Sequence, residues 1–158
     1  MKKYIFIVVL LMGVCSMITM IYPDKTVYAS EEQKVGNSDY GEMYIYPDTV
    51  EAVKKDKRYF VVVSAEDRYT DEKFLAHLRQ GKNMENAVST LALYMFTNDG
   101  RFYCMVQRYL IDSEGKVCVD LGSDMQFRAI DEKILTDVYT ASLKVLEDKK
   151  RFQNMMGR

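Results

Sequence analysis

Residues 90–121 read TLALYMFTNDGRFYCMVQRYLIDSEGKVCVDL and carry the strongest structural signal in the chain. Two runs rich in aromatic, methionine and aliphatic residues, 90–97 and 101–111, flank the turn sequence Asn98–Gly100. An Asp-Gly pair between two such runs is typical of a tight β-hairpin. A second turn signal at Ser113–Gly115 leads into a third run. The segment therefore predicts a three-stranded antiparallel meander.

The hairpin sorts its side chains onto two faces. If Asp99 and Gly100 occupy the turn, paired positions sum to 199, and residues two apart along a strand share a face. Because monomers seldom expose large apolar patches, a second apolar face needs either a covering helix or a binding partner. One face is a credible core and holds Leu91, Leu93, Met95, Phe102, Cys104 and Val106. The other is our candidate partner face and holds Tyr94, Phe96, Tyr103, Met105 and Tyr109.

A long amphipathic helix is predicted after the meander. It begins at Asp131, a good N-cap residue, and runs to about Lys150. Its apolar stripe at helical spacing consists of Ile134, Leu135, Val138, Tyr139, Ala141, Val145 and Leu146. A sheet with one such helix on a face is a two-layer α+β domain.

The segments that precede the meander predict further elements of the same domain. The short β-prone run at 43–46 stops at a Pro-Asp turn, and Tyr59–Val63 is apolar at consecutive positions. Such a continuous run suits a central strand buried on both faces. Thr70 can cap a short helix near 71–80, with Gly81 at its left-handed stop.

The N-terminus has the layout of a secretory signal peptide. Lys2 and Lys3 precede an apolar run at 4–22, and small residues precede Ser30 in the pattern Val-Tyr-Ala. We therefore expect residues 1–29 to be removed by cleavage between Ala29 and Ser30. The alternative is an uncleaved anchor, because the 18 residues from Ile5 to Tyr22 are just enough to cross a bilayer.

The expected organisation is a signal peptide at 1–29, a flexible leader at 30–42, a single domain at 43–150 and a short basic tail at 151–158. The whole chain has a net charge of −1, and the 129 residues after position 29 carry 19 basic and 22 acidic side chains, a net charge of −3. This balance argues against a nucleic-acid partner, because phosphate binding needs a basic surplus. Membrane contact is expected only through the signal segment before cleavage.

The residues that could carry chemistry are few. The chain has one histidine, which excludes a site with several histidine ligands, and it has no P-loop, G-x-S-x-G or H-E-x-x-H motif. Adjacent acids such as Glu66 and Asp67 are read as solvated. Cys104 and Cys118 are expected to be unpaired, because the meander separates them by roughly 20 Å, far beyond the reach of a disulfide. No enzyme activity, cofactor or metal is expected.

Several segments together suggest a family. They are Tyr44-x-Tyr46-x-Asp48-x-Val50, the strand at 59–63, Leu93-Tyr94-x-Phe96, the run from Tyr109 to Val117, and Gln126-Phe127-x-x-Ile130 leading into the helix. Their order resembles the bacterial surface-adhesin protein E-like domain over residues 43–147. The resemblance implies an exported domain in which an antiparallel sheet holds a C-terminal helix, and adhesion to host extracellular proteins.

Two positions depart from the family pattern. Phe127 stands where the family usually has Trp, and Leu146 stands near a position where it often has a Cys that ties the helix to the sheet. We expect Phe127 to fill the seam between helix and sheet, with packing alone holding the helix.

The function expected from these observations is a non-catalytic, adhesin-like protein that is exported to the cell surface, the periplasm or the medium. Its partner would be an extracellular or envelope protein, and self-association as a homodimer is kept open. The alternative is a periplasmic structural or small-ligand-binding module with no host partner, because a fold by itself does not transfer a function.

Overall fold

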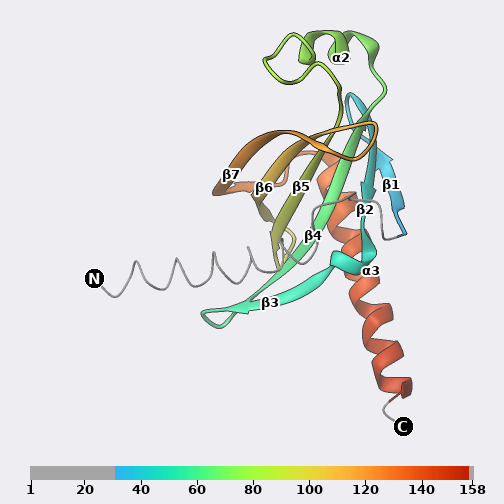
Figure 1. Cartoon of the computed structure of the whole chain (residues 1–158). Helices are drawn as coiled ribbons and strands as arrows, with labels where there is room; N and C mark the ends of the chain where they lie inside the picture. Colours follow the sequence, from blue (N-terminus) through green and yellow to red (C-terminus); the bar gives the residue numbers. More distant parts are fainter. Residues whose placement is uncertain (1–30, 157–158) are drawn as a thin grey trace.

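Strand β4 forms the middle of an antiparallel sheet in the computed structural model, which describes residues 31–156, with side chains up to residue 150 (Figure 1). The sheet has seven strands in these residues, ordered β1-β2-β4-β5-β6-β7, and β3 pairs with β4 beyond the end of β2. Helix α3 packs on one face. The elements are β1 (Gln33–Asn37), β2 (Gly41–Ile45), η1 (Pro47–Thr49), β3 (Glu51–Lys55), β4 (Arg58–Tyr69), α2 (Glu72–Leu78), β5 (Ala87–Thr97), β6 (Phe102–Asp112), β7 (Val117–Ala129) and α3 (Lys133–Met156).

The predicted α+β class and meander are confirmed, and the hairpin register holds near its turn. Phe96 lies opposite Tyr103 and Tyr94 opposite Met105, so these pairs sum to 199 as expected. Beyond them a β-bulge shifts the pairing by one residue, and Leu93 faces Gln107. Because one extra residue exchanges the faces of a strand, the β6 side chains from Gln107 to Ile111 lie on the face opposite to the predicted one.

The central strand is longer than predicted. Val61 and Val63, which share the face under α3, are buried, but Phe60 and Val62 on the other face are only half-buried and Tyr59 is exposed, so the run is not buried on both faces as predicted. The strand continues to Tyr69, and residues 63–66 are buried at four consecutive positions. Glu66 is one of them, so the interpretation of this acid as solvated is wrong. It lies inside a strand rather than in a loop.

The expectation of a flexible leader at 30–42 is wrong for the residues that the structure describes. Gln33–Asn37 forms strand β1, which pairs with β2 at the sheet edge. Its residues are polar and partly exposed, which is why no hydrophobic pattern predicted it. Gly36 lets α3 approach closely, since a Cβ there would lie 2.9 Å from Cδ1 of Ile134. Residues 1–29 and the bond between Ala29 and Ser30 lie outside the described residues.

Helix α2 is present, with different end residues from those predicted. Asp71 rather than Thr70 is its N-cap, and its carboxylate accepts hydrogen bonds from the backbone N–H groups of Lys73 and Phe74. The left-handed residue after the helix is Asn83, at φ 64°, and not Gly81. An aspartate at the cap satisfies two free N–H groups at once, which a threonine one residue earlier does not do here.

Helix α3 confirms the predicted apolar stripe. Val138 is fully buried and Leu135 nearly so, while Tyr139, Ala141, Val145 and Leu146 pack around them. The helix begins at Lys133, two residues after the expected cap Asp131, and it continues to Met156. Residues 151–156 are therefore helical, and the expected tail at 151–158 is wrong over that range. Lys149 ties the helix to η1, because its Nζ donates to the carbonyl oxygen of Pro47 at 2.8 Å.

Candidate binding surface

The candidate partner face of the hairpin is core. Phe96 is completely buried and Tyr103 is 8% exposed, and both pack against α3. The rings of Phe96 and Tyr139, a residue of α3, lie 5.6 Å apart between centroids. Tyr94 and Met105 belong to the same helix–sheet core. These four side chains are therefore not available to a partner, and burial beneath the helix is the correct interpretation.

Tyr109, the fifth residue of that predicted face, lies on the other side of the sheet. The bulge places it opposite Leu91, and it packs on Leu91, Ile111 and Tyr46. We call this side the outer face, meaning the sheet face opposite α3. Nothing in the local sequence predicts the bulge, because neither Val106 nor Gln107 is a glycine or a proline.

The outer face carries an apolar cluster that reaches the surface. Cys104 and Met95 are buried in it, and Phe60 packs against it. The Phe127 ring lies 5.8 Å from the Phe60 ring and remains 40% exposed. Phe102 is 43% exposed and pairs with Ala129, two residues beyond Phe127 in β7. We call Phe60, Phe102 and Phe127 the outer aromatic patch.

This position of Phe127 corrects the expectation that it fills the seam between helix and sheet. Arg128 pairs with Tyr103, whose side chain lies in the helix–sheet core. Because neighbours in a strand point to opposite faces, Phe127 points to the outer face. Ile130, just after β7, packs in the helix–sheet core instead.

The other end of the outer face holds a buried charge network. The side chain of Glu66 is 2% exposed, and its carboxylate accepts hydrogen bonds from the Tyr46 hydroxyl and from Nη2 of Arg68, the latter at 2.9 Å. The Arg68 guanidinium also binds Glu32 through Nη1 at 2.8 Å and lies 4.4 Å from the centre of the Tyr44 ring. This hydrogen bond to Arg68 lowers the pKa of Glu32, and burial raises the pKa of Tyr46.

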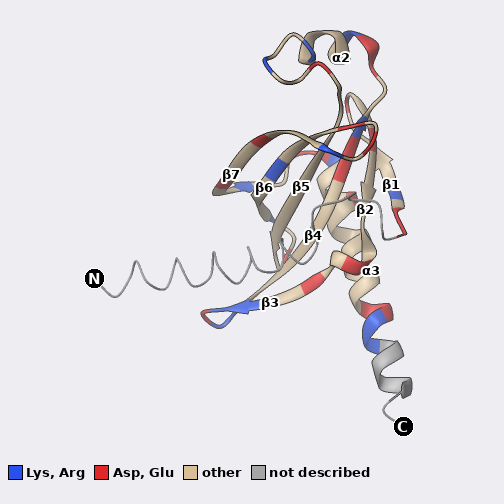
Figure 2. Ribbon diagram, viewed as in Figure 1, with Lys and Arg blue, Asp and Glu red and all other residues tan. Residues whose placement is uncertain are grey.

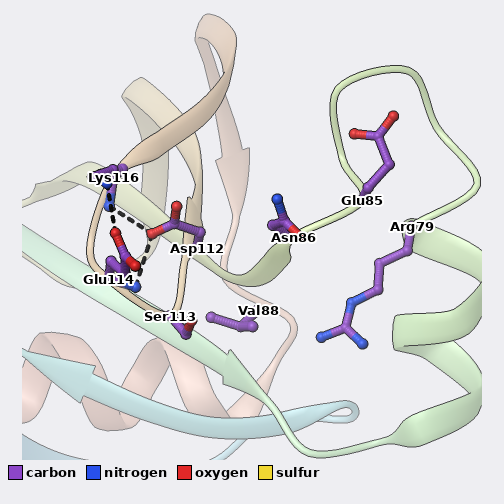
Figure 3. A pocket seen from close by; sticks show the side chains of 8 residues that line it. All are labelled: Arg79, Glu85, Asn86, Val88, Asp112, Ser113, Glu114 and Lys116. Atoms are coloured by element: carbon purple, nitrogen blue, oxygen red, sulfur yellow. Dashed lines mark hydrogen bonds and ion pairs between the residues drawn. The ribbon is translucent and has the colours of Figure 1, made fainter.

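Two cavities open next to this network. One has a volume of about 570 Å³ and lies between the loop after α2 and the β6–β7 turn (Figure 3). Arg79 points into it, anchored by its Nε, which donates to the carbonyl of Ala87 at 3.1 Å. The second, about 470 Å³, is lined by Glu66 and Arg68 and shares Val88 and Ser113 with the first. The first cavity is lined mostly by polar and charged side chains, which suits a small polar ligand better than an apolar one.

The two described cysteines are free, as predicted. Cys118 lies between the residues that pair with Leu110 and Ile111, so the meander keeps it away from Cys104. Burial is the main cause that raises the pKa of the Cys104 thiol, to about 11. His77 is exposed on α2, whereas Cys104 is buried in β6. Among the described residues, these two side chains are therefore not arranged as a Cys–His pair.

Thiol labelling is expected to separate these two cysteines. At pH 8 only about a thousandth of a thiol with a pKa near 11 is thiolate, so buried Cys104 should react far more slowly than half-buried Cys118. Timed alkylation of the native protein, followed by peptide mass spectrometry, measures both rates. Both residues should label fully after unfolding without reductant. Equal native rates, or protection of either thiol in the unfolded protein, would contradict the strand arrangement.

Among the described residues, no group of three or more His, Cys, Asp or Glu side chains could hold a metal ion. Over the same part of the chain, no helix is both long and apolar enough to cross a membrane. No family model, curated protein or solved structure matches this chain.

Proposed function

We propose that the protein is a non-catalytic, exported, adhesin-like binding protein whose outer aromatic patch contacts an extracellular protein partner. The observation that carries the proposal is the Phe127 ring, which is 40% exposed and lies on Phe60, a residue packed against the apolar cluster of the outer face. Export rests on the signal-peptide layout of residues 1–29, and adhesion rests on the resemblance to the surface-adhesin protein E-like domain.

The chemistry of the patch favours a protein partner that presents an apolar or aromatic side chain. Aromatic residues are enriched at the centre of protein interfaces, where they contribute much of the binding energy. Because the opposite face of the sheet is filled by α3, the outer face is where a partner has access.

Phe127→Ser is expected to weaken binding at least tenfold, because it removes an exposed ring at the centre of the patch, a loss typical of an interface hot spot. Surface plasmon resonance against a panel of purified extracellular-matrix proteins measures the affinities. Val117→Ser is the matched control, since Val117 lies in the same strand and is 52% exposed, far from Phe127 along β7. Equal affinity of the Phe127 variant and the wild type for every partner bound would contradict this docking site.

A periplasmic module that binds a small ligand is the second candidate, and the two cavities beside Glu66 and Arg79 favour it. Protease treatment of intact cells distinguishes the two functions. Cleavage of the domain on intact cells supports the surface-exposed binding protein, whereas protection until the envelope is opened supports the periplasmic module.

Sedimentation of the wild type and the Phe127 variant tests the homodimer, which the substitution should dissociate if the patch forms the dimer contact.

A further inference from the structure

The hairpin formed by β3 and the first residues of β4 extends from the sheet as a two-stranded arm (Figure 1). Lys54 pairs with Tyr59 and Lys55 with Arg58. Strand β5 pairs with β4 only from Phe60 onward, so these last two pairs have no third strand beside them. We call residues 54–59 the basic arm. Its backbone is held by its own ladder, and its side chains are free to meet a ligand.

The basic arm has a strong local charge. Four of the five residues from 54 to 58 are basic and one is acidic, a net charge of +3, whereas the rest of the chain has a net charge of −4. The ribbon is blue, the colour of Lys and Arg, near the tip of the hairpin (Figure 2). Within the described part of the chain, none of these four cations forms an ion pair; they are Lys54, Lys55, Lys57 and Arg58. A concentrated, unneutralised charge of this kind attracts anions over about 10 Å at moderate salt.

Folding alone does not favour this arrangement. Lys55 and Arg58 are directly opposite, and like charges in a cross-strand pair are destabilising. The turn residues Asp56 and Lys57 have φ values of 47° and 69°, a left-handed conformation that glycine or asparagine adopts at lower cost than lysine. The tip therefore keeps cations in places where stability would favour other residues, which points to a role in binding.

The distribution of the cations indicates the shape of the ligand. Lys54 and Tyr59 lie on one face of the arm, and Lys55 and Arg58 lie on the other, because paired residues share a face and successive residues alternate. A flat membrane would contact only one of these faces and would bring the acidic remainder of the chain close to its own negative surface. A linear polymer can follow the tip of the arm and meet cations on both faces.

Tyr59 indicates the chemistry of that polymer. Its ring is 52% exposed, and Nζ of Lys54 lies 5.4 Å from the ring centre. An exposed aromatic ring offers a flat apolar platform for the C–H face of a sugar, while the ammonium that lies over the ring can bind an anionic substituent. We propose that the basic arm binds a linear anionic polysaccharide, through its sulfate or carboxylate groups.

The test compares the full-length protein with two double variants of equal charge change. Lys57→Gln/Arg58→Gln removes two cations from the arm, and Lys73→Gln/Lys82→Gln removes two exposed cations near α2, away from the arm. The probes are dextran sulfate and polygalacturonate, with neutral dextran as the uncharged reference. Each cation removed from the arm should lower the affinity about fivefold, so the arm variant should bind the charged polymers about 25-fold more weakly than the wild type. The α2 variant should match the wild type.

Stability and salt provide the remaining readouts. Arg58→Gln relieves the repulsion with Lys55, so the thermal midpoint of the arm variant should equal or exceed that of the wild type. Raising the salt concentration should weaken wild-type binding more steeply than that of the arm variant. Phe127→Ser should leave polysaccharide affinity unchanged, which keeps this inference separate from the proposed protein partner. Binding to dextran sulfate alone would identify sulfate as the group that the arm recognises, and binding to polygalacturonate alone would identify carboxylate. Either result supports the proposal.

Four results would overturn the inference. The first is equal weakening by the two double variants, which would show only a dependence on overall charge. The second is tighter binding to phosphatidylglycerol vesicles than to either polymer, which would assign the arm to a membrane. The third is tighter binding to polyglutamate, which would assign it to an acidic protein. The fourth is the absence of any binding to the two charged polysaccharides at low salt.

Discussion

Phe96→Ala should lower the free energy of unfolding by about 3–5 kcal/mol. Phe96 is completely buried at the centre of the helix–sheet core, where its ring contacts Tyr103 and Tyr139. Truncation removes apolar contacts between β5 and α3 and leaves a cavity that the close-packed neighbours can fill only in part. Urea unfolding monitored by circular dichroism measures the change, and the loss should be accompanied by release of α3.

Phe102→Ala is the control for this substitution. It deletes the same side chain from the neighbouring strand, but Phe102 is 43% exposed on the outer face. The expected loss is below about 1.5 kcal/mol, because much of the ring is already in water. Comparable losses at the two positions would contradict the assignment of the hairpin faces, since that assignment makes one ring core and the other surface.

Glu66→Ala should lower the free energy of unfolding by about 2–4 kcal/mol. The substitution leaves the buried Tyr46 hydroxyl without this acceptor and deprives Arg68 of a carboxylate partner. Arg68 keeps Glu32, so the loss should stay at or below the upper end of the range for breaking a buried ion pair. Chemical denaturation at neutral pH and fixed salt measures it.

Two variants place this effect in the network. Tyr46→Phe removes only the hydroxyl and should cost about 1 kcal/mol, and its effect should shrink when Glu66 is already Ala. Glu85→Ala removes an exposed loop acid at the neighbouring cavity and should change stability by less than about 0.5 kcal/mol. Additive losses in the Tyr46–Glu66 double variant would contradict a direct hydrogen bond between the two side chains.

The fold could be predicted where local chemistry was sufficient. The Asp99-Gly100 turn set the register of the first three pairs in the hairpin, and the stripe of α3 was read from its helical spacing. Strand β1 could not be predicted, because Gln33–Asn37 is a polar edge strand that depends on pairing with β2. Its polar composition is that of a loop, and only the partner strand distinguishes the two.

The candidate binding surface could not be predicted from local patterns. Glu66 looks like a solvated acid, yet Tyr46, twenty residues earlier in the chain, shares a hydrogen bond with it in the interior. Phe127 was expected at the seam with α3, and the pairing of Arg128 with Tyr103 turned it to the outer face. Pairing between strands that are distant in the sequence decides to which face of the sheet a side chain points, and a shift of one residue in that pairing moves it to the opposite face.

The amino-acid sequence by itself determined the α+β class, the meander and the long amphipathic helix, because turn chemistry and side-chain periodicity act within a few residues. Only the tertiary structure decided which face of the sheet is core. Both faces of the hairpin are apolar, and α3 can cover only one of them. It covers the face with Phe96 and Tyr103, while the bulge after Met105 carries Tyr109 to the other side. The outer aromatic patch is the apolar surface that this choice left exposed.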